Sequence, residues 1–205
     1  MHFASVPAGG FAANCYLVWE ETSRRAALID PSAAAAAVSD VLRERSLTLT
    51  HILLTHVHFD HILTLEALRA AFGVPVCVHA ADAAALGDPI ANVSSYLFHE
   101  RLVCHDADHL LADGEEIRLG GGTLTVLHTP GHTPGSVVYR ADGLLFTGDT
   151  LFDGSVGRTD LPGGDAGALR ASLCRLAALP PETVICPGHG GTSTIGRQIR
   201  TNPFL

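Results

Sequence analysis

The chain of 205 residues has a formal net charge of −8, with 47% hydrophobic and 17% charged residues, a composition typical of a packed globular domain. All thirteen basic residues are arginine, which excludes Schiff-base or general-base chemistry by lysine, and no basic face for nucleic acid is visible. Neither a signal peptide nor an apolar run near the about 20 residues of a membrane span is found. We therefore expect one cytoplasmic domain over residues 1–205 that acts on a small molecule, binds neither nucleic acid nor membranes, and has an oligomeric state that the sequence leaves open.

The first half of the chain alternates short apolar runs with helical patterns. Three β-type runs open it, separated by short turns as in hairpins, and they cover residues 3–6, 15–19 and 26–29. Asp30-Pro31-Ser32 then ends the third strand and can cap a helix, which alanine-rich helical spacing predicts over 33–45. A strand, a helix closed by Gly73, a strand and a helix follow. Their predicted ranges are 52–54, 62–72, 74–79 and 80–86.

Residues 87–113 show no clear period, and a second β-rich block comes after them. Its strands are predicted at 116–119, 124–128, 136–140 and 144–147, with turns at 120–122 and 142–143. After a glycine-rich loop at 153–165, Asp165 can cap a helix. The last predicted elements are a helix over 166–178, a strand over 184–186 and a helix over 194–200. Strands and helices in both halves favour two sheets packed face to face with helices outside.

Cysteine and histidine differ in how they are spaced. The five cysteines are odd in number, scattered and without a CxxC pair, which argues against a disulfide framework and a thiolate zinc site. We expect all five to be small buried residues in a reducing compartment. They are Cys15, Cys77, Cys104, Cys174 and Cys186. Histidine, the commonest metal ligand, reaches twelve residues, several of them close together.

The densest group of metal-binding residue types is His56-x-His58-x-Asp60-His61, between a short apolar strand and a helix. Residues two apart in an extended segment point to the same side, so His56 and His58 can share a site. Asp60 and His61 fall where the chain turns into the helix and can face the same cavity from another angle. Four such side chains in six residues exceed what one tetrahedral ion takes from a single segment. We expect a shared site that distant residues complete.

Three further candidates follow apolar strands in glycine-containing turns: His132, Asp149 and His189. Strand ends of this kind can present side chains to a common pocket at one edge of a sheet. The other histidines lack such a pattern and are predicted not to bind metal, although His128, four residues before His132, could support a ligand from outside. The remaining ones are His2, His51, His79, His99, His105 and His109.

These motifs together resemble the metallo-β-lactamase superfamily, and within it a short bacterial form of the glyoxalase II-like hydrolases. The segments that carry the resemblance are 55–61, 129–135, 148–149 and 188–189, with weaker matches at 14–16, 157–165 and 194–205. The resemblance implies an α+β four-layer αββα sandwich, the metallo-β-lactamase fold, in which two mixed sheets have helices outside and the site lies at one edge. The chain departs from the family in lacking the glycine pair that commonly follows the Asp-His step, which concerns helix packing and not the ligands.

The resemblance also implies two divalent metal ions, with zinc favoured and iron or manganese as alternatives. The first ion would be held by His56, His58, His132 and Asp149, and the second by Asp60, His61, Asp149 and His189, so that Asp149 bridges them. Asp60 is in addition the predicted catalytic residue, because it would orient a hydroxide held between the ions. No residue is identified for binding substrate.

The implied activity is metal-dependent hydrolysis of a thioester, as in a hydroxyacylglutathione hydrolase, by attack of the metal-bridging hydroxide. The sequence has no GxSxG nucleophile elbow, which fits a mechanism without a protein nucleophile. Sixteen residues follow His189, so we do not expect the C-terminal helical region with which glyoxalase II enzymes bind glutathione. Arg158 either holds a substrate carboxylate or pairs with Asp160 to brace its loop, and the second interpretation is favoured.

The main alternative is a persulfide dioxygenase, which shares the fold and would bind a single iron through His56, His132 and Asp149. A non-catalytic binding protein on this fold is disfavoured because every ligand position is filled. A flavodiiron oxidoreductase needs a glutamate near position 58 and a flavin domain, and neither is seen. Antibiotic hydrolysis is disfavoured by the missing export signal.

Overall fold

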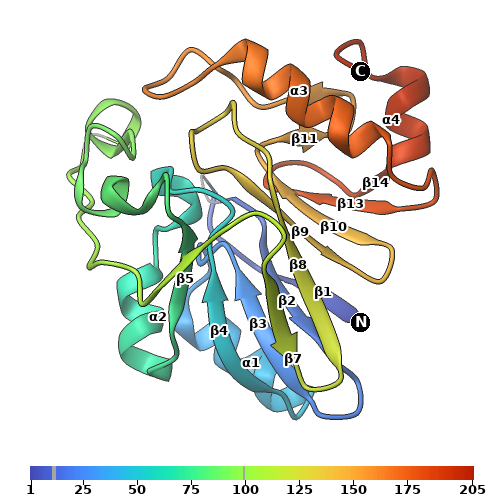
Figure 1. The fold of residues 1–205 in the computed structure, drawn as a ribbon. Coiled ribbons are helices and arrows are strands. Elements are labelled where there is room, and N and C mark those ends of the chain that lie inside the picture. Colours follow the sequence, from blue (N-terminus) through green and yellow to red (C-terminus); the bar gives the residue numbers. More distant parts are fainter. Residues whose placement is uncertain (11–12, 99) are drawn as a thin grey trace.

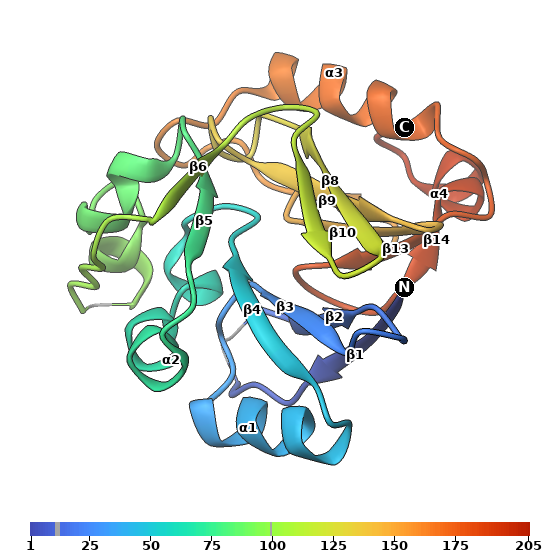
Figure 2. The ribbon, with the colours of Figure 1, turned by 60° about the horizontal axis from the view of Figure 1, so that its bottom comes forward.

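The computed structural model describes residues 1–10, 13–98 and 100–205. Two six-stranded sheets pack face to face, and helices cover the outer face of each (Figures 1 and 2). Both sheets mix parallel and antiparallel pairs, so the predicted α+β four-layer αββα sandwich is confirmed. None of the helices among the described residues has the length and apolar character needed to cross a membrane.

The first sheet is built by the first half of the chain. Its elements are β1 (His2–Val6), β2 (Cys15–Trp19), β3 (Arg25–Ile29), α1 (Ala35–Glu44), β4 (Thr48–Leu53), α2 (Leu65–Phe72), β5 (Val76–His79) and β6 (His109–Leu111). The strands β1, β2 and β3 pair antiparallel, as the hairpin turns predicted, and β4 to β6 add on in parallel. The parallel pairs need crossovers, and α1 and α2 lie in two of them.

The second sheet has the strand order β14-β13-β10-β9-β8-β7. The elements of this half are β7 (Glu116–Leu119), β8 (Gly122–His128), β9 (Val137–Ala141), β10 (Leu144–Gly148), the ribbon β11 (Leu151–Phe152) with β12 (Ser155–Val156), α3 (Ala166–Ala177), β13 (Val184–Pro187), β14 (Ser193–Thr194) and α4 (Ile195–Thr201). The predicted turn at Asp142-Gly143 is confirmed as a two-residue hairpin between β9 and β10, with positive φ at both residues. The Asp165 carboxylate caps α3 by accepting from the backbone N–H of Gly167 and Ala168, as predicted.

Three buried apolar clusters follow the layers. One lies between the first sheet and α1 and α2, and one lies between the two sheets, where Tyr139 and Phe146 are fully buried. The third lies between the second sheet and α3 and α4. Figure 2 shows the resulting order of helices, sheet, sheet and helices. The core therefore fixes both sheets and leaves their shared edge to the loops.

Several local expectations are wrong. The helix predicted over 80–86 is a 3₁₀ turn at Ala83–Gly87, and the unpatterned stretch after it contains a π-helical turn at Ser94–Phe98 before β6. Asp30 ends β3 as expected but caps no helix, because the N-cap of α1 is Ala34, without a side-chain hydrogen bond. All five cysteines are free as predicted, but Cys174 is exposed rather than buried, since it lies on the outer face of α3.

The fold gathers strand ends at one edge. Strands β3 and β4 run parallel in the first sheet, and β10 and β13 run parallel in the second. β8 has the same direction as β10, because both are antiparallel to β9. The carboxyl ends of these five strands therefore meet, and the segments that follow them carry all the candidate ligands.

Candidate metal centre

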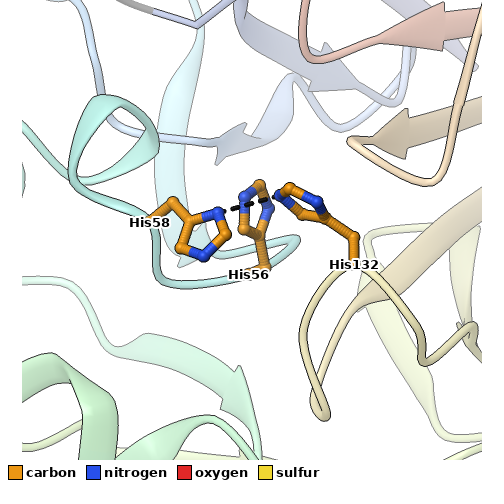
Figure 3. Close-up of side chains that lie close together, drawn as sticks. All are labelled: His56, His58 and His132. Atoms are coloured by element: carbon orange, nitrogen blue, oxygen red, sulfur yellow. Dashed lines mark hydrogen bonds between the residues drawn. The ribbon is translucent and has the colours of Figure 1, made fainter. Parts of the chain in front are cut away.

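Three histidines form the deepest part of the site. His56 and His58 follow β4 and His132 follows β8, and all three side chains are buried. Their ligand nitrogens lie within 4.8 Å of one another, a grouping that could hold a metal ion (Figure 3). His58 Nδ1 and His132 Nε2 lie 2.8 Å apart. The sequence thus places imidazoles from both sheets around one point, and we call this group the three-histidine side.

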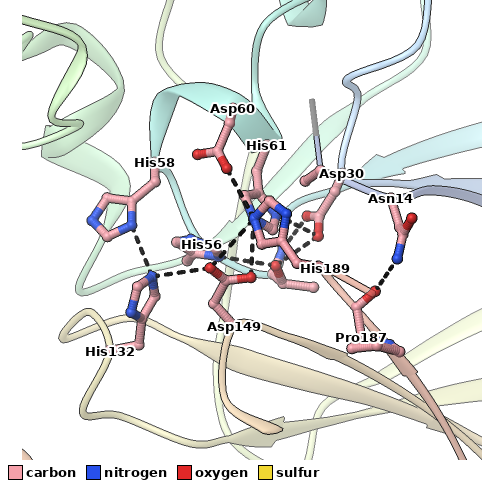
Figure 4. Close-up of polar contacts among 12 residues, drawn as sticks. Asn14, Asp30, His56, His58, Asp60, His61, His132, Asp149, Pro187 and His189 are labelled. Atoms are coloured by element: carbon pink, nitrogen blue, oxygen red, sulfur yellow. Dashed lines mark hydrogen bonds and ion pairs between the residues drawn. The ribbon is translucent and has the colours of Figure 1, made fainter. Parts of the chain in front are cut away.

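The opposite part of the site contains Asp60, His61 and His189, which form a second grouping that could hold a metal ion. Asp60 and His61 lie in a 3₁₀ turn, Phe59–His61, and His189 follows β13. His189 Nε2 is 3.0 Å from Asp60 Oδ2, and His61 Nε2 is 3.9 Å from the same oxygen (Figure 4). We call this group the carboxylate side.

Asp149, at the end of β10, lies between the two sides. Its Oδ1 is 3.2 Å from His61 Nε2, and its Oδ2 is 3.6 Å from His132 Nε2 and 3.7 Å from His189 Nε2. The structure therefore brings together all seven residues that the sequence nominated (Figure 4). Their assignment as ligands, and the role of Asp149 as a bridge, stay predictions.

The end of β10 can lie close to the segment after β4 because residue 148 is glycine. Its φ is +46°, which L side chains rarely adopt, and a Cβ there would lie 2.4 Å from Thr55 Oγ1. A Cβ at Gly188 would lie 2.3 Å from Asp149 Oδ1. Larger residues at either position would push β10 or β13 away from the ligand segment of the first sheet.

Hydrogen bonds from outside the cluster orient three of the imidazoles. His56 Nδ1 donates to Thr55 Oγ1 at 3.1 Å, His61 Nδ1 to Asp30 Oδ2 at 2.9 Å, and His132 Nδ1 to the backbone oxygen of Arg158 at 2.8 Å. In each case the Nε2 atom is left for the centre of the site. Fixing one ring nitrogen in this way sets the tautomer and orientation of a metal-binding histidine.

Unpartnered buried atoms test whether a cation fits here. His56 Nε2, His61 Nε2 and Asp149 Oδ1 are buried in the cluster without a hydrogen-bond partner, although the last two lie 3.2 Å apart as an ion pair. His58 Nε2 also lacks a partner, but His58 faces the cluster with Nδ1 (Figure 4). Buried polar atoms in folded proteins are nearly always paired, so three in one cluster need an explanation. Imidazole nitrogens and carboxylate oxygens are suitable ligands for zinc, iron or manganese. The residues therefore fit a divalent metal.

Asp30 is the supporting residue that the sequence analysis missed. It is buried at the end of β3 with φ +54°, and its Oδ1 accepts from Thr55 N at 2.8 Å. Its Oδ2 accepts from Thr55 Oγ1 and from His61 Nδ1. The same pattern that singled out Asp149, an aspartate directly after an apolar strand, is also present at Asp30. Because Pro31 and Ser32 follow Asp30, the sequence pattern predicts a helix cap instead.

The two sides differ in electrostatics. Burial, followed by the neighbouring imidazoles, lowers the pKa of His56 well below its ordinary value and that of His58 to about 3. Burial opposes the charged form of His61 too, but the carboxylates of Asp149, Asp30 and Asp60 outweigh it and raise the pKa of His61 well above normal. A hydrogen bond to Asp60 raises the pKa of His189. The carboxylate side thus pairs charges, whereas the three-histidine side is neutral.

The other nominated residues lie around this site or away from it. His128 Nε2 donates to Pro134 O in the turn that carries His132, and its ring stacks on His79. It thus supports the ligand turn and not the ligand itself. Arg158 pairs with Asp160 through two bonds of 2.6 and 2.7 Å, the interpretation favoured from the sequence. In the described residues the remaining histidines join no metal-binding group, and His99 lies outside those residues.

A buried cluster of histidines and aspartates at the edge of an αββα sandwich defines the metallo-hydrolase class. The family model of the metallo-beta-lactamase superfamily matches residues 8–189, and the chain belongs to this superfamily. It is 36% identical to the probable metallo-hydrolase YqgX of Bacillus subtilis, covering 100% of this chain and 98% of that protein. It is 35% identical to hydroxyacylglutathione hydrolase GloC of Haemophilus influenzae, with the same coverage. The resemblance stated from the sequence is confirmed.

Solved structures agree with this assignment. The fold matches the crystal structure of BLEG-1 B3 metallo-beta-lactamase with a TM-score of 0.93 and 41% identity, covering 100% of this chain and 99% of that one. TTHA1623 in a di-iron-bound form matches with a TM-score of 0.85 and 38% identity, covering 98% and 100%. ETHE1 from Myxococcus xanthus matches with a TM-score of 0.80 and 34% identity, covering 99% and 84%.

Proposed function

We propose that this protein hydrolyses a thioester of the hydroxyacylglutathione type with two divalent metal ions, zinc in the first instance. The observation that carries the proposal is the complete cluster of seven side chains, in which three buried ligand atoms make no hydrogen bond. Full-length similarity to GloC supports the thioester as substrate. Membership of the superfamily supports a metal-dependent hydrolase in general.

The two groupings suggest how the ions would be held. His56, His58 and His132 would hold one ion, Asp60, His61 and His189 the other, and Asp149 would contact both. Bound there, two cations supply a nucleophile at neutral pH and stabilise negative charge on the reacting carbonyl. The protein's own part is to keep these side chains in place and the deep side free of bulk water.

Asp60 has the properties of the residue that orients the attacking water. Ion pairs with His61 and His189 outweigh the effect of burial and lower the pKa of its carboxyl, so it stays an acceptor at neutral pH. Its side chain is 17% exposed, beside the half-exposed His189, so solvent and substrate reach this side. A charged carboxylate at the mouth of the site can accept a hydrogen bond from water and so orient it, while the bond to His189 holds the carboxylate in place.

A persulfide dioxygenase is the second candidate. Similarity to ETHE1 from Myxococcus xanthus over 99% of this chain favours it, and His56, His132 and Asp149 lie close enough to form the three-ligand set expected for a single iron. Four further ligand-type side chains in the same cluster favour two metals and hydrolysis.

The test combines elemental analysis of the purified protein with three assays: hydrolysis of a hydroxyacylglutathione thioester, oxygen consumption with glutathione persulfide, and opening of a β-lactam. We expect two metal ions per chain and turnover of the thioester alone. His58→Ala and Asp60→Ala should abolish that turnover, whereas His105→Ala, an exposed histidine away from the site, should not. Thioester hydrolysis that survives His58→Ala would refute the mechanism, and oxygen consumption with one iron would replace it by the dioxygenase.

A further inference from the structure

A second buried carboxylate, Asp82, connects the two sheets behind the three-histidine side. It stands after β5, at the start of the 3₁₀ turn Ala83–Gly87, and only 2% of it is exposed. Its side chain makes no capping bond to that turn. Instead Asp82 Oδ2 accepts from Thr133 Oγ1 at 2.7 Å, and Asp82 Oδ1 accepts from Gly135 N at 2.6 Å. The carboxylate therefore bonds a distant segment and not the 3₁₀ turn that follows it.

The partners of Asp82 belong to the two segments that carry the three histidines. Thr133 directly follows His132 in the turn after β8. The backbone N–H of Val57, which lies between His56 and His58, acts against burial and lowers the pKa of the Asp82 carboxyl. Asp82 itself follows β5 of the first sheet, so its side chain links the first sheet to the turn of the second.

Asp82 lies so close to the turn after β8 that only glycine fits at position 135. A Cβ at Gly135 would lie 2.5 Å from Asp82 Cγ and 2.6 Å from its backbone nitrogen. The Thr133 hydroxyl is itself fixed, because it lies 2.8 Å from Ser136 Oγ, which also accepts from Thr133 N at 3.1 Å. The turn is therefore held to the carboxylate at two points with little freedom to shift.

Such a carboxylate is costly to bury. Within the described part of the chain no arginine or histidine forms an ion pair with Asp82; hydrogen-bond donors are its main partners, and His128 adds a weaker electrostatic attraction. A buried charge without a cationic partner destabilises a fold unless donors replace its water. An apolar contact at this point would connect the sheets without the free-energy cost of a buried carboxylate, but it would not define the direction and length of the link.

We propose that Asp82 is a positioning residue that sets the spacing between His132 and the His56–His58 pair, and thereby the metal affinity of the three-histidine side. This inference rests on the metal-binding part of the proposed function and not on the thioester as substrate. Partners that orient ligands from outside the coordination sphere typically change metal affinity by about 10–100-fold when they are removed.

The test compares Asp82→Asn and Thr133→Val, which each remove part of the link, with Thr133→Ser, which keeps the hydroxyl. Thr50→Val is the matched control, because it removes a threonine hydroxyl bond, to Ala26 O, in β4 away from the site. Zinc affinity is measured by competition with a chelator, the ligand geometry by the absorption spectrum of the cobalt(II)-substituted protein, and stability by urea unfolding of the metal-free chain.

We expect Asp82→Asn and Thr133→Val to weaken zinc binding about 10–100-fold and to change the cobalt spectrum, and Thr133→Ser to restore both. Thr50→Val should lower stability alone. Wild-type affinity and spectrum in both link variants would overturn the inference and leave Asp82 a purely structural residue. If Asp82→Asn does not fold, the Thr133 pair decides. If the wild-type protein binds zinc but does not hydrolyse the thioester, the proposed function is overturned and this inference is not.

Discussion

The two sides of the metal centre differ in how they bring polar groups together. On the three-histidine side, buried neutral imidazoles face one another, and burial lowers the pKa values of His56 and His58. On the carboxylate side, Asp60, Asp149 and Asp30 surround His61 and raise its pKa. The unpartnered His61 Nε2 lies 3.2 Å from a carboxylate oxygen of Asp149, whereas the unpartnered His56 Nε2 faces other imidazoles. We therefore expect the three-histidine side to depend more strongly on a bound metal.

Exposure adds to this difference. The His58 and His132 side chains are each 3% exposed or less, but the His189 side chain is 42% exposed. Water can take the place of a ligand at an exposed position and hardly at a buried one. The support also differs, because Asp82 lies behind the turn that carries His132, whereas Asp30 contacts His61 directly and reaches His56 only through Thr55. Single substitutions on each side test these differences.

The largest effect should come from removing one ligand on each side. We expect His132→Ala to lose zinc affinity by more than about 100-fold, beyond the range for supporting residues, and to have no measurable turnover. His189→Ala should lose less, about 10-fold in affinity, and should keep one metal ion, because water can enter its place. Metal content after gel filtration and chelator competition measure both. Equal losses in the two variants would contradict the asymmetry.

What the sequence predicted at this site depended on local pattern. The seven candidate ligands each follow an apolar strand in a short motif, and parallel strands end at a common edge, so their meeting could be foreseen. The Asp165 cap and the Asp142-Gly143 turn were predictable for the same reason: each depends on residues within three positions of one another.

What the sequence did not predict depends on partners that are far away along the chain. Asp30 looks like a helix cap locally and Asp82 falls inside a predicted helix, but their carboxylates bond residues 25 and 51 positions away. The helical character of 80–86 was overestimated because alanine is the best helix former, whereas the close approach of Asp82 to Gly135 holds the start of this segment. Tertiary contacts overrode propensity there.

A smaller effect is expected from substitution of Asp30, which supports the carboxylate side. Asp30→Asn keeps the shape and the bonds that an amide oxygen can accept, but it removes the negative charge beside His61 Nδ1. We expect zinc affinity to fall about 10-fold, at the lower end for supporting residues. In the proposed two-metal site, Asp30→Asn should affect the ion on the carboxylate side more, whereas Asp82→Asn should affect the ion on the three-histidine side more. Two-step zinc titration distinguishes them. An identical change of both steps in both variants would show that the sides are not supported separately.

The smallest effect is expected at Arg158. Its side chain is 54% exposed and its partner Asp160 66% exposed, and exposed ion pairs contribute little to stability. The bond that matters for His132 comes from the Arg158 backbone oxygen, which Arg158→Ala retains. Arg158→Ala should therefore change the Tm by less than about 2 °C and leave zinc content and the KM for the thioester within about 2-fold of wild type. Asp160→Ala is the matched variant, because it frees the guanidinium without removing it. A KM that rises in Arg158→Ala at unchanged kcat, but not in Asp160→Ala, would instead place Arg158 on a substrate carboxylate.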